Sequence, residues 1–138
     1  MSDTLHISTG EKRIAIERDG KPAGEIVFNP SDVVFAEKFY RLIGEFETKS
    51  DEFSRRAEEV KDDTGAQLAL LSETCTYFKE KINYLFGETA SKVAFGDANT
   101  LDMFSQFFEG MTPFIRGART QKIAQYMPPA KAKQRKRK

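Results

Sequence analysis

The chain has 138 residues, of which 39% are apolar and 31% charged, a length that suits one domain with a modest core rather than two. Its single cysteine excludes an internal disulfide, and no aliphatic run approaches the roughly twenty apolar residues of a membrane span. No secretory pattern stands at the N-terminus, so we expect a soluble, cytosolic protein.

The N-terminal part predicts an arm over residues 1–11 and a β-hairpin over residues 12–28. Within the arm, the segment LHIS is a candidate third strand. The hairpin strands, at 12–18 and 23–28, flank an Asp19-Gly20 turn signal. Because Lys21-Pro22 follows this signal, we expect a loop longer than two residues.

Two apolar seams with helical spacing come next. The first predicts a helix over about 32–61, capped by Ser31 or Asp32. One of its two apolar rows ends halfway along, so we expect its second half to be less covered. The second seam is unbroken and predicts a helix over about 66–86. Because only the segment DDTG separates the two helices, they should pack antiparallel.

Two Phe-Gly pairs, at 86–87 and 95–96, follow the second helix. A phosphate-binding loop needs glycines that cluster ahead of a helix, whereas these two lie nine residues apart, each after a large apolar residue. We therefore assign Gly87 and Gly96 to helix ends with positive φ. Between them we expect only a short helical turn, over residues 91–95.

A last helix is predicted over about 100–126, with Asn99 or Thr100 as its cap. Pro113 should kink or interrupt it, because proline lacks the N–H donor. Beside its main apolar stripe runs a second one, which is more apolar surface than one buried face needs. Either the helix is buried on two sides, or the second stripe binds a partner or another copy, in which case Phe107→Asp should spare the fold. The second stripe consists of Met103, Phe107 and Phe114.

The sequence therefore predicts an α+β fold that is mostly α, with the N-terminal β-hairpin followed by a three- to four-helix antiparallel bundle. We expect residues 12–127 to form a single domain, followed by a disordered basic tail over 128–138. Residues 1–115 hold 13 Lys and Arg against 21 acids, a net charge of −8, whereas residues 116–138 hold 9 basic residues and no acid. Three roles fit such a tail: attraction to an acidic protein surface, binding of nucleic acid without sequence preference, or solubility alone. Its candidate partner-binding residues are Lys131, Lys133, Arg135, Lys136, Arg137 and Lys138.

No set of side chains in the sequence indicates catalysis. His6 is the only histidine, which excludes a triad or zinc cluster built on histidines. Cys75 occupies a seam position that is typical of a buried thiol. The adjacent acids at 58–59 and 62–63 point to different sides of a helix and cannot share a reacting atom. We therefore expect no enzymatic activity, no metal and no cofactor.

The order of the predicted elements resembles that of a known protein family. A hairpin leads into FNPSDVVFAEKFYRLIGEF, and a Cys-bearing helix then ends in YFKEKINYLFGETASKVAFGDANTLDMFSQFFEGMTPFI. Over about residues 12–117 this resembles a family of small proteins encoded in the tail-gene clusters of long-tailed phages of Gram-positive bacteria, marked by two Phe-Gly pairs before a final helix. The resemblance implies a tail assembly chaperone in the host cell cytoplasm. Such a protein keeps the tape-measure protein soluble until tail-tube polymerisation, with the tape-measure or tail-tube protein as partner, and no catalytic residues.

Two other classes stay open at this point. A structural tail or connector component of the virion needs the same apolar, self-associating surfaces as a chaperone. A small nucleic-acid-binding protein would instead act through the basic tail. Presence in purified virions separates the first of these from a chaperone, whereas sequence alone does not.

Overall fold

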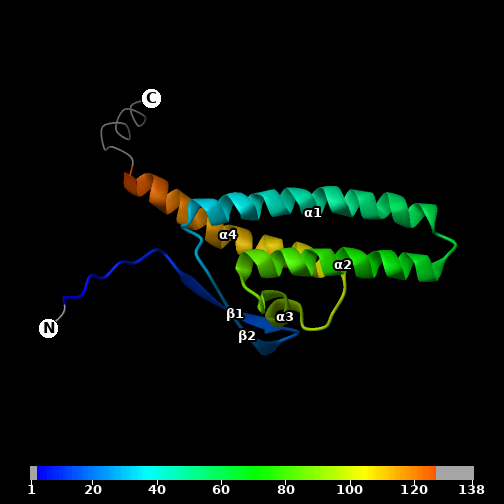
Figure 1. Ribbon diagram of the computed structural model, residues 1–138, viewed down its shortest axis with the longest axis horizontal. Coiled ribbons are helices and arrows are strands. Elements are labelled where there is room, and N and C mark those ends of the chain that lie inside the picture. Colours follow the sequence, from blue (N-terminus) through cyan, green and yellow to red (C-terminus); the bar gives the residue numbers. More distant parts are fainter. Residues whose placement is uncertain (1–2, 127–138) are drawn as a thin grey trace, which may run out of the picture.

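The computed structural model describes residues 3–126, with side chains as far as residue 118. In chain order the elements are β1 (Lys12–Arg18), β2 (Lys21–Phe28), α1 (Val33–Glu59), α2 (Thr64–Phe86), α3 (Ala90–Phe95) and α4 (Leu101–Tyr126). Helices α1 and α2 run antiparallel, and α4 packs beside them. The hairpin and α3 form a layer on the side of α2 that faces away from α1 (Figure 1). The predicted α+β, mostly α fold is confirmed.

The turn of the β-hairpin is tighter than predicted. β2 begins at Lys21, which pairs with Arg18, so that only Asp19 and Gly20 connect the strands. Both residues have positive φ, 54° and 78°, as a two-residue hairpin turn requires. The expected longer loop is wrong, because the register shift after Ile16 takes up the extra length as a bulge inside the sheet.

Side-chain caps fix the starts of the three long helices. Asp32 accepts a hydrogen bond from the backbone N–H of Val34 at 2.8 Å, and Asp63 accepts one from Ala66 at 3.0 Å. At the start of α4, the Thr100 hydroxyl accepts a weaker bond from a backbone N–H at 3.3 Å. Of the alternative caps predicted, Asp32 and Thr100 are therefore the ones observed, and the Asp63 cap starts α2 earlier than predicted.

Gly87 and Gly96 end α2 and α3. Their φ angles are 121° and 60°, and their N–H groups donate to the carbonyls of Asn83 and Lys92 at 2.9 and 2.8 Å. The short helical turn expected between the two Phe-Gly pairs is α3. The assignment of both glycines to helix ends with positive φ is confirmed.

Phenylalanine rings form the centre of the core. Phe39, Phe78 and Phe104, one from each long helix, are fully buried. The Phe46 ring lies 5.1 Å from that of Phe78 and 6.3 Å from that of Phe104, in tilted and edge-on geometries that aromatic pairs prefer. The ring of Phe28 in β2 lies 5.4 Å from the ring of Phe86, the last residue of α2. The hairpin therefore shares one core with the helices.

Helix α4 continues through Pro113 without interruption. Pro113 is exposed, so the carbonyl that loses its usual N–H donor lies on the solvent side of the helix. One residue earlier, the Thr112 hydroxyl donates to the Phe108 carbonyl at 2.6 Å. Of the predicted kink or interruption at Pro113, the interruption is wrong, because Met111 and Ile115 are buried on either side of it and hold the helix against the core.

A hydrogen bond between α1 and α2 gives one tyrosine a high pKa. The Tyr77 hydroxyl donates to the Glu45 carboxylate at 2.6 Å, and this bond, with burial and the negative charge of Glu45, raises the pKa of Tyr77 to about 12. We expect the difference between the alkaline absorbance titrations of the wild type and Tyr77→Phe to have its midpoint near that value. In the Glu45→Gln background the midpoint should fall toward the ordinary value of 10.

The raised pKa of Tyr77 also makes the free energy of unfolding depend on pH. Because the pKa of Tyr77 is higher in the folded than in the unfolded chain, the contribution of this bond is complete below pH 10 and is lost as the pH rises toward 12. The loss should be absent from Tyr77→Phe. A wild-type midpoint that Glu45→Gln leaves unchanged would show that the hydrogen bond does not control the titration.

Candidate partner-binding grooves

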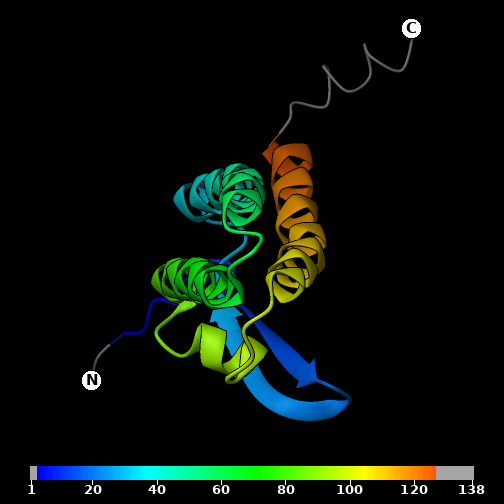
Figure 2. The same ribbon diagram turned by 90° about the vertical axis from the view of Figure 1, so that its right-hand side faces the viewer.

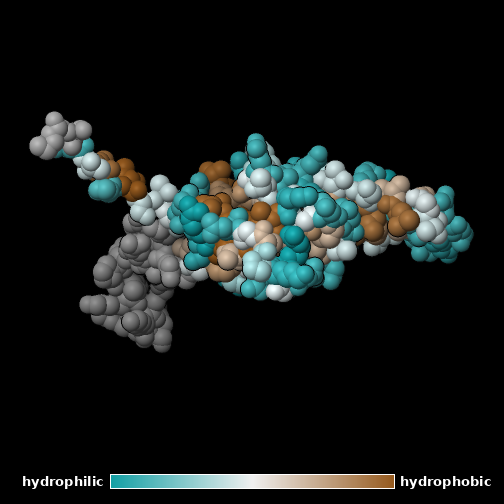
Figure 3. Space-filling model, turned by 90° about the horizontal axis from the view of Figure 1, so that it is seen from below, coloured by the Kyte–Doolittle hydropathy of each residue, from teal (hydrophilic) through white to brown (hydrophobic). Residues whose placement is uncertain are grey.

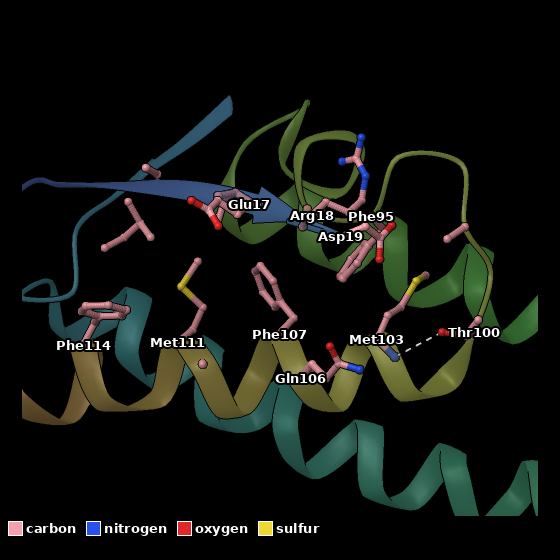
Figure 4. Close-up of a pocket in the computed structure, with 16 residues that line it drawn as sticks. Glu17, Arg18, Asp19, Phe95, Thr100, Met103, Gln106, Phe107, Met111 and Phe114 are labelled. Carbon is pink, nitrogen blue, oxygen red and sulfur yellow. Dashed lines mark hydrogen bonds between the residues drawn. The ribbon is translucent and has the colours of Figure 1, made fainter. Parts of the chain in front are cut away.

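A groove of about 570 Å³ runs between β1 and α4 (Figure 4). We call it the β1–α4 groove. Helix α4 lines it with Met103, Phe107, Met111 and Phe114, and Figure 4 shows Phe107 and Met111 pointing from the helix toward β1. Phe95 of α3 lines the end nearest the hairpin turn. The helix side of the groove is therefore largely apolar.

The strand lines this groove with its edge. Residues 14–19 border the groove without a gap, although successive side chains of a strand point to opposite faces of a sheet. An uninterrupted run of lining residues places the strand edge, with its backbone N–H and C=O groups, along the groove. Within residues 3–126 the sheet contains β1 and β2 alone, so this edge has no strand beside it.

The predicted second stripe of α4 lines the groove, but its three side chains differ in accessibility. Phe107 is only 8% exposed, with its ring 5.1 and 5.6 Å from rings of α2 and α3. Met103 is half-buried against the core, whereas Phe114 is 37% exposed, with the Lys12 ammonium 5.5 Å from its ring. Of the two alternatives for the second stripe, Phe107 follows burial on two sides, because the rings of Phe86 and Phe95 pack onto it; the expectation that Phe107→Asp spares the fold is therefore not supported.

A second groove, of about 520 Å³, lies between α1 and the first turns of α4. We call it the α1–α4 groove. Helix α4 begins at Leu101, and the far ends of α1 and α2 project beyond it (Figure 1). From Glu47 to Glu59 no residue of α1 is buried, as the loss of its second apolar row predicts. Three apolar side chains, three serines and three exposed carboxylates line the groove: Phe46, Phe53 and Leu101, then Ser50, Ser54 and Ser105, then Glu47, Asp51 and Asp102.

The charged groups around Gly96 make contacts within the chain. Arg18 donates to the Val93 carbonyl at 2.6 Å and to the Lys92 carbonyl at 3.3 Å, which satisfies the C-terminal end of α3. The Lys92 ammonium donates to Asp97 at 2.7 Å, and this bond lowers the pKa of that carboxyl. A Cβ on Gly96 would lie 3.0 Å from the Arg18 guanidinium carbon. Glycine is therefore needed here to admit Arg18.

The residues with reactive side chains lie apart. Cys75 is fully buried, and burial raises the pKa of its thiol, with the charge of Lys79 acting in the opposite direction. His6 is exposed on the N-terminal arm. Within the described part of the chain, no three of the His, Cys, Asp and Glu side chains gather as metal ligands would. None of the helices described there is long and apolar enough to cross a membrane.

The six basic candidates of the tail, Lys131 to Lys138, lie outside the described residues. The chain belongs to a protein family of unknown function, DUF6673, whose model matches residues 24–138. The match begins inside β2 and includes all four described helices, whereas the arm and β1 precede it. Searches among curated proteins and among solved structures gave no match.

Proposed function

We propose that this protein is a tail assembly chaperone of a long-tailed phage, which binds the tape-measure protein in the host cytoplasm and keeps it soluble before the tail tube polymerises. The observation that carries the proposal is the α1–α4 groove, where apolar side chains lie among serines and carboxylates at the projecting end of an acidic body. The order of elements on which the resemblance rests adds support.

The groove has the chemistry to receive an amphipathic helix. An apolar stripe of the client would lie against Phe53 and Leu101, and Lys or Arg beside that stripe would meet Glu47, Asp51 and Asp102. Charge contacts at the margin of a groove guide association and are screened beyond about 8 Å at physiological salt. Weak and reversible contacts of this kind suit a coat that tube subunits must later remove.

Reversing the two carboxylates on α1 tests this assignment. We expect Glu47→Lys with Asp51→Lys to weaken binding to the tape-measure protein about tenfold at low salt, and less at high salt. The measurement is co-expression with the tape-measure protein, followed by its soluble fraction and by titration of a labelled tape-measure segment. Both carboxylates are exposed, so the melting temperature should stay the same.

Glu37→Lys with Glu80→Lys is the matched control, because it changes net charge equally at exposed positions outside the groove. Equal losses in the two double variants would point to net charge and remove the groove from the proposal. Failure of the wild type to bind or solubilise the tape-measure protein would overturn the chaperone function. Detection of the chain in purified virions would favour a structural tail component instead.

A further inference from the structure

The N-terminal arm projects from the body with its apolar side chains uncovered. Residues 3–11 have no regular secondary structure, and Leu5 and Ile7 are 83% and 75% exposed. Figure 3 shows hydrophobic residues on this arm, away from the rest of the protein. In an extended chain, residues two apart point to the same side, so Leu5 and Ile7 form one apolar face, with polar residues between and beside them. The candidate third strand is therefore outside the sheet, but has the pattern of a strand with one buried face.

The base of the arm directs it away from the β1–α4 groove of its own chain. The Asn29 side chain donates to the Thr9 carbonyl at 2.8 Å. Gly10 has a φ of +100°, and a Cβ there would lie 2.7 Å from that of Ser31, so the path is specific to glycine. Figure 2 shows the arm leaving past α2, on the side away from α4, and α4 is one wall of the groove. To enter its own groove, the arm would have to reverse at residues 9–11 and lose these contacts.

We propose that residues 4–8 of one copy occupy the β1–α4 groove of a second copy, as a strand paired with the free edge of β1. The lengths agree: the helix from Met103 to Phe114 is about 18 Å long, and five residues of strand are about 17 Å long. Leu5 and Ile7 then cover the apolar side chains of α4. His6 and Ser8 point to solvent.

This arrangement satisfies two surfaces that one copy leaves open. The edge of β1 gains hydrogen bonds for backbone groups that otherwise face water, as in other cases of strand addition. Two large apolar side chains leave solvent at the same time. Because the arm and the groove both belong to this chain, the contact should form without a tape-measure client.

Cysteine pairs in separate chains test the contact. A chain with Ile7→Cys, mixed with a chain carrying Gly110→Cys, should give a covalent dimer under mild oxidation, because Gly110 lines the groove. Gly44→Cys is the matched control: both glycines are exposed in long helices and have open space at the Cβ position. We expect at least about tenfold less dimer with Gly44→Cys. The native Cys75 is fully buried and common to every variant.

Self-association of the otherwise unmodified chain gives an independent readout. Leu5→Asp with Ile7→Asp should raise the dissociation constant measured by sedimentation at least tenfold, since burial of each such side chain is worth roughly that factor. Leu68→Asp, at an exposed leucine of α2 outside the groove, should leave it unchanged. A wild type that stays monomeric at every concentration overturns the proposal. So does an internal cross-link within a monomer that carries both Ile7→Cys and Gly110→Cys.

Discussion

Replacing Phe107 with Asp should strongly destabilise the fold. Phe107 is 8% exposed and its ring contacts Phe86 and Phe95. Removing such a ring costs about 3–5 kcal/mol, and a carboxyl group in the same place adds an unpaired polar group or charge. We therefore expect a loss of at least about 4 kcal/mol, a large part of the roughly 5–15 kcal/mol that stabilises a typical domain. Urea unfolding followed by circular dichroism measures it.

Phe114→Asp is the matched control on the same helix. Its ring is 37% exposed at the open side of the β1–α4 groove, so the substitution should cost about 1 kcal/mol or less. The difference in stability between the two variants shows that Phe107 is part of the core at the floor of the groove, whereas Phe114 lies on its accessible side. If Phe107→Asp folds as stably as Phe114→Asp, then α3 does not pack on α4 in solution and the groove is wider than described.

Replacing Gly96 with Val should destabilise the protein by about 2 kcal/mol or more. A φ of 60° is costly for any residue with a Cβ, by about 1–3 kcal/mol, and a β-branched side chain is the least tolerant. The new side chain would also meet the Arg18 guanidinium, which lies 3.0 Å from the Cβ position. Arg18 would then lose its two hydrogen bonds to the carbonyl groups of α3. Thermal and urea unfolding report the combined effect.

Gly87→Val separates the two causes. Gly87 also has a positive φ, 121°, but a Cβ there would meet no atom within 4 Å. It should show the backbone cost alone, and Gly44→Val, in regular helix, should change stability by less than about 0.5 kcal/mol. Equal losses at Gly87 and Gly96 would mean that displacing Arg18 costs nothing. Binding of phosphate that disappears with Gly96→Val would restore the phosphate-loop alternative.

Most of the fold is predictable from local sequence, because its signals are short-range. The seam of α2, the cap at Asp32 and the glycines at 87 and 96 each act through neighbours within about one helical turn. The two errors, the longer loop after Gly20 and the interruption of the helix at Pro113, have a different origin. A bulge depends on the partner strand, and a proline is tolerated when tertiary packing holds the helix on its other side.

The candidate site is less predictable, because a groove exists only between elements. The second stripe of α4 identifies one wall of the β1–α4 groove from the sequence. The other wall depends on where the hairpin docks, and the burial of Phe107 depends on Phe95, which reaches it only after α3 folds back. One feature of the sequence indicates the α1–α4 groove, namely the loss of the second apolar row in the second half of α1. Its acidic border involves residues of two helices, and no spacing in the sequence brings these together.

The Arg18 bond to α3 joins residues 75 positions apart, whereas α1 and α2 are joined by a turn of a few residues. Since closing a long loop costs more chain entropy than closing a short one, the α1–α2 pair has the faster route to its native contacts. Gly24 of β2 packs so closely on Val93 that a Cβ on Gly24 would lie 3.3 Å from the Val93 side chain, so this contact has almost no free space. We therefore expect the hairpin and α3 to dock late in folding, and the apolar side of α4 that faces them to be accessible to other chains until they do.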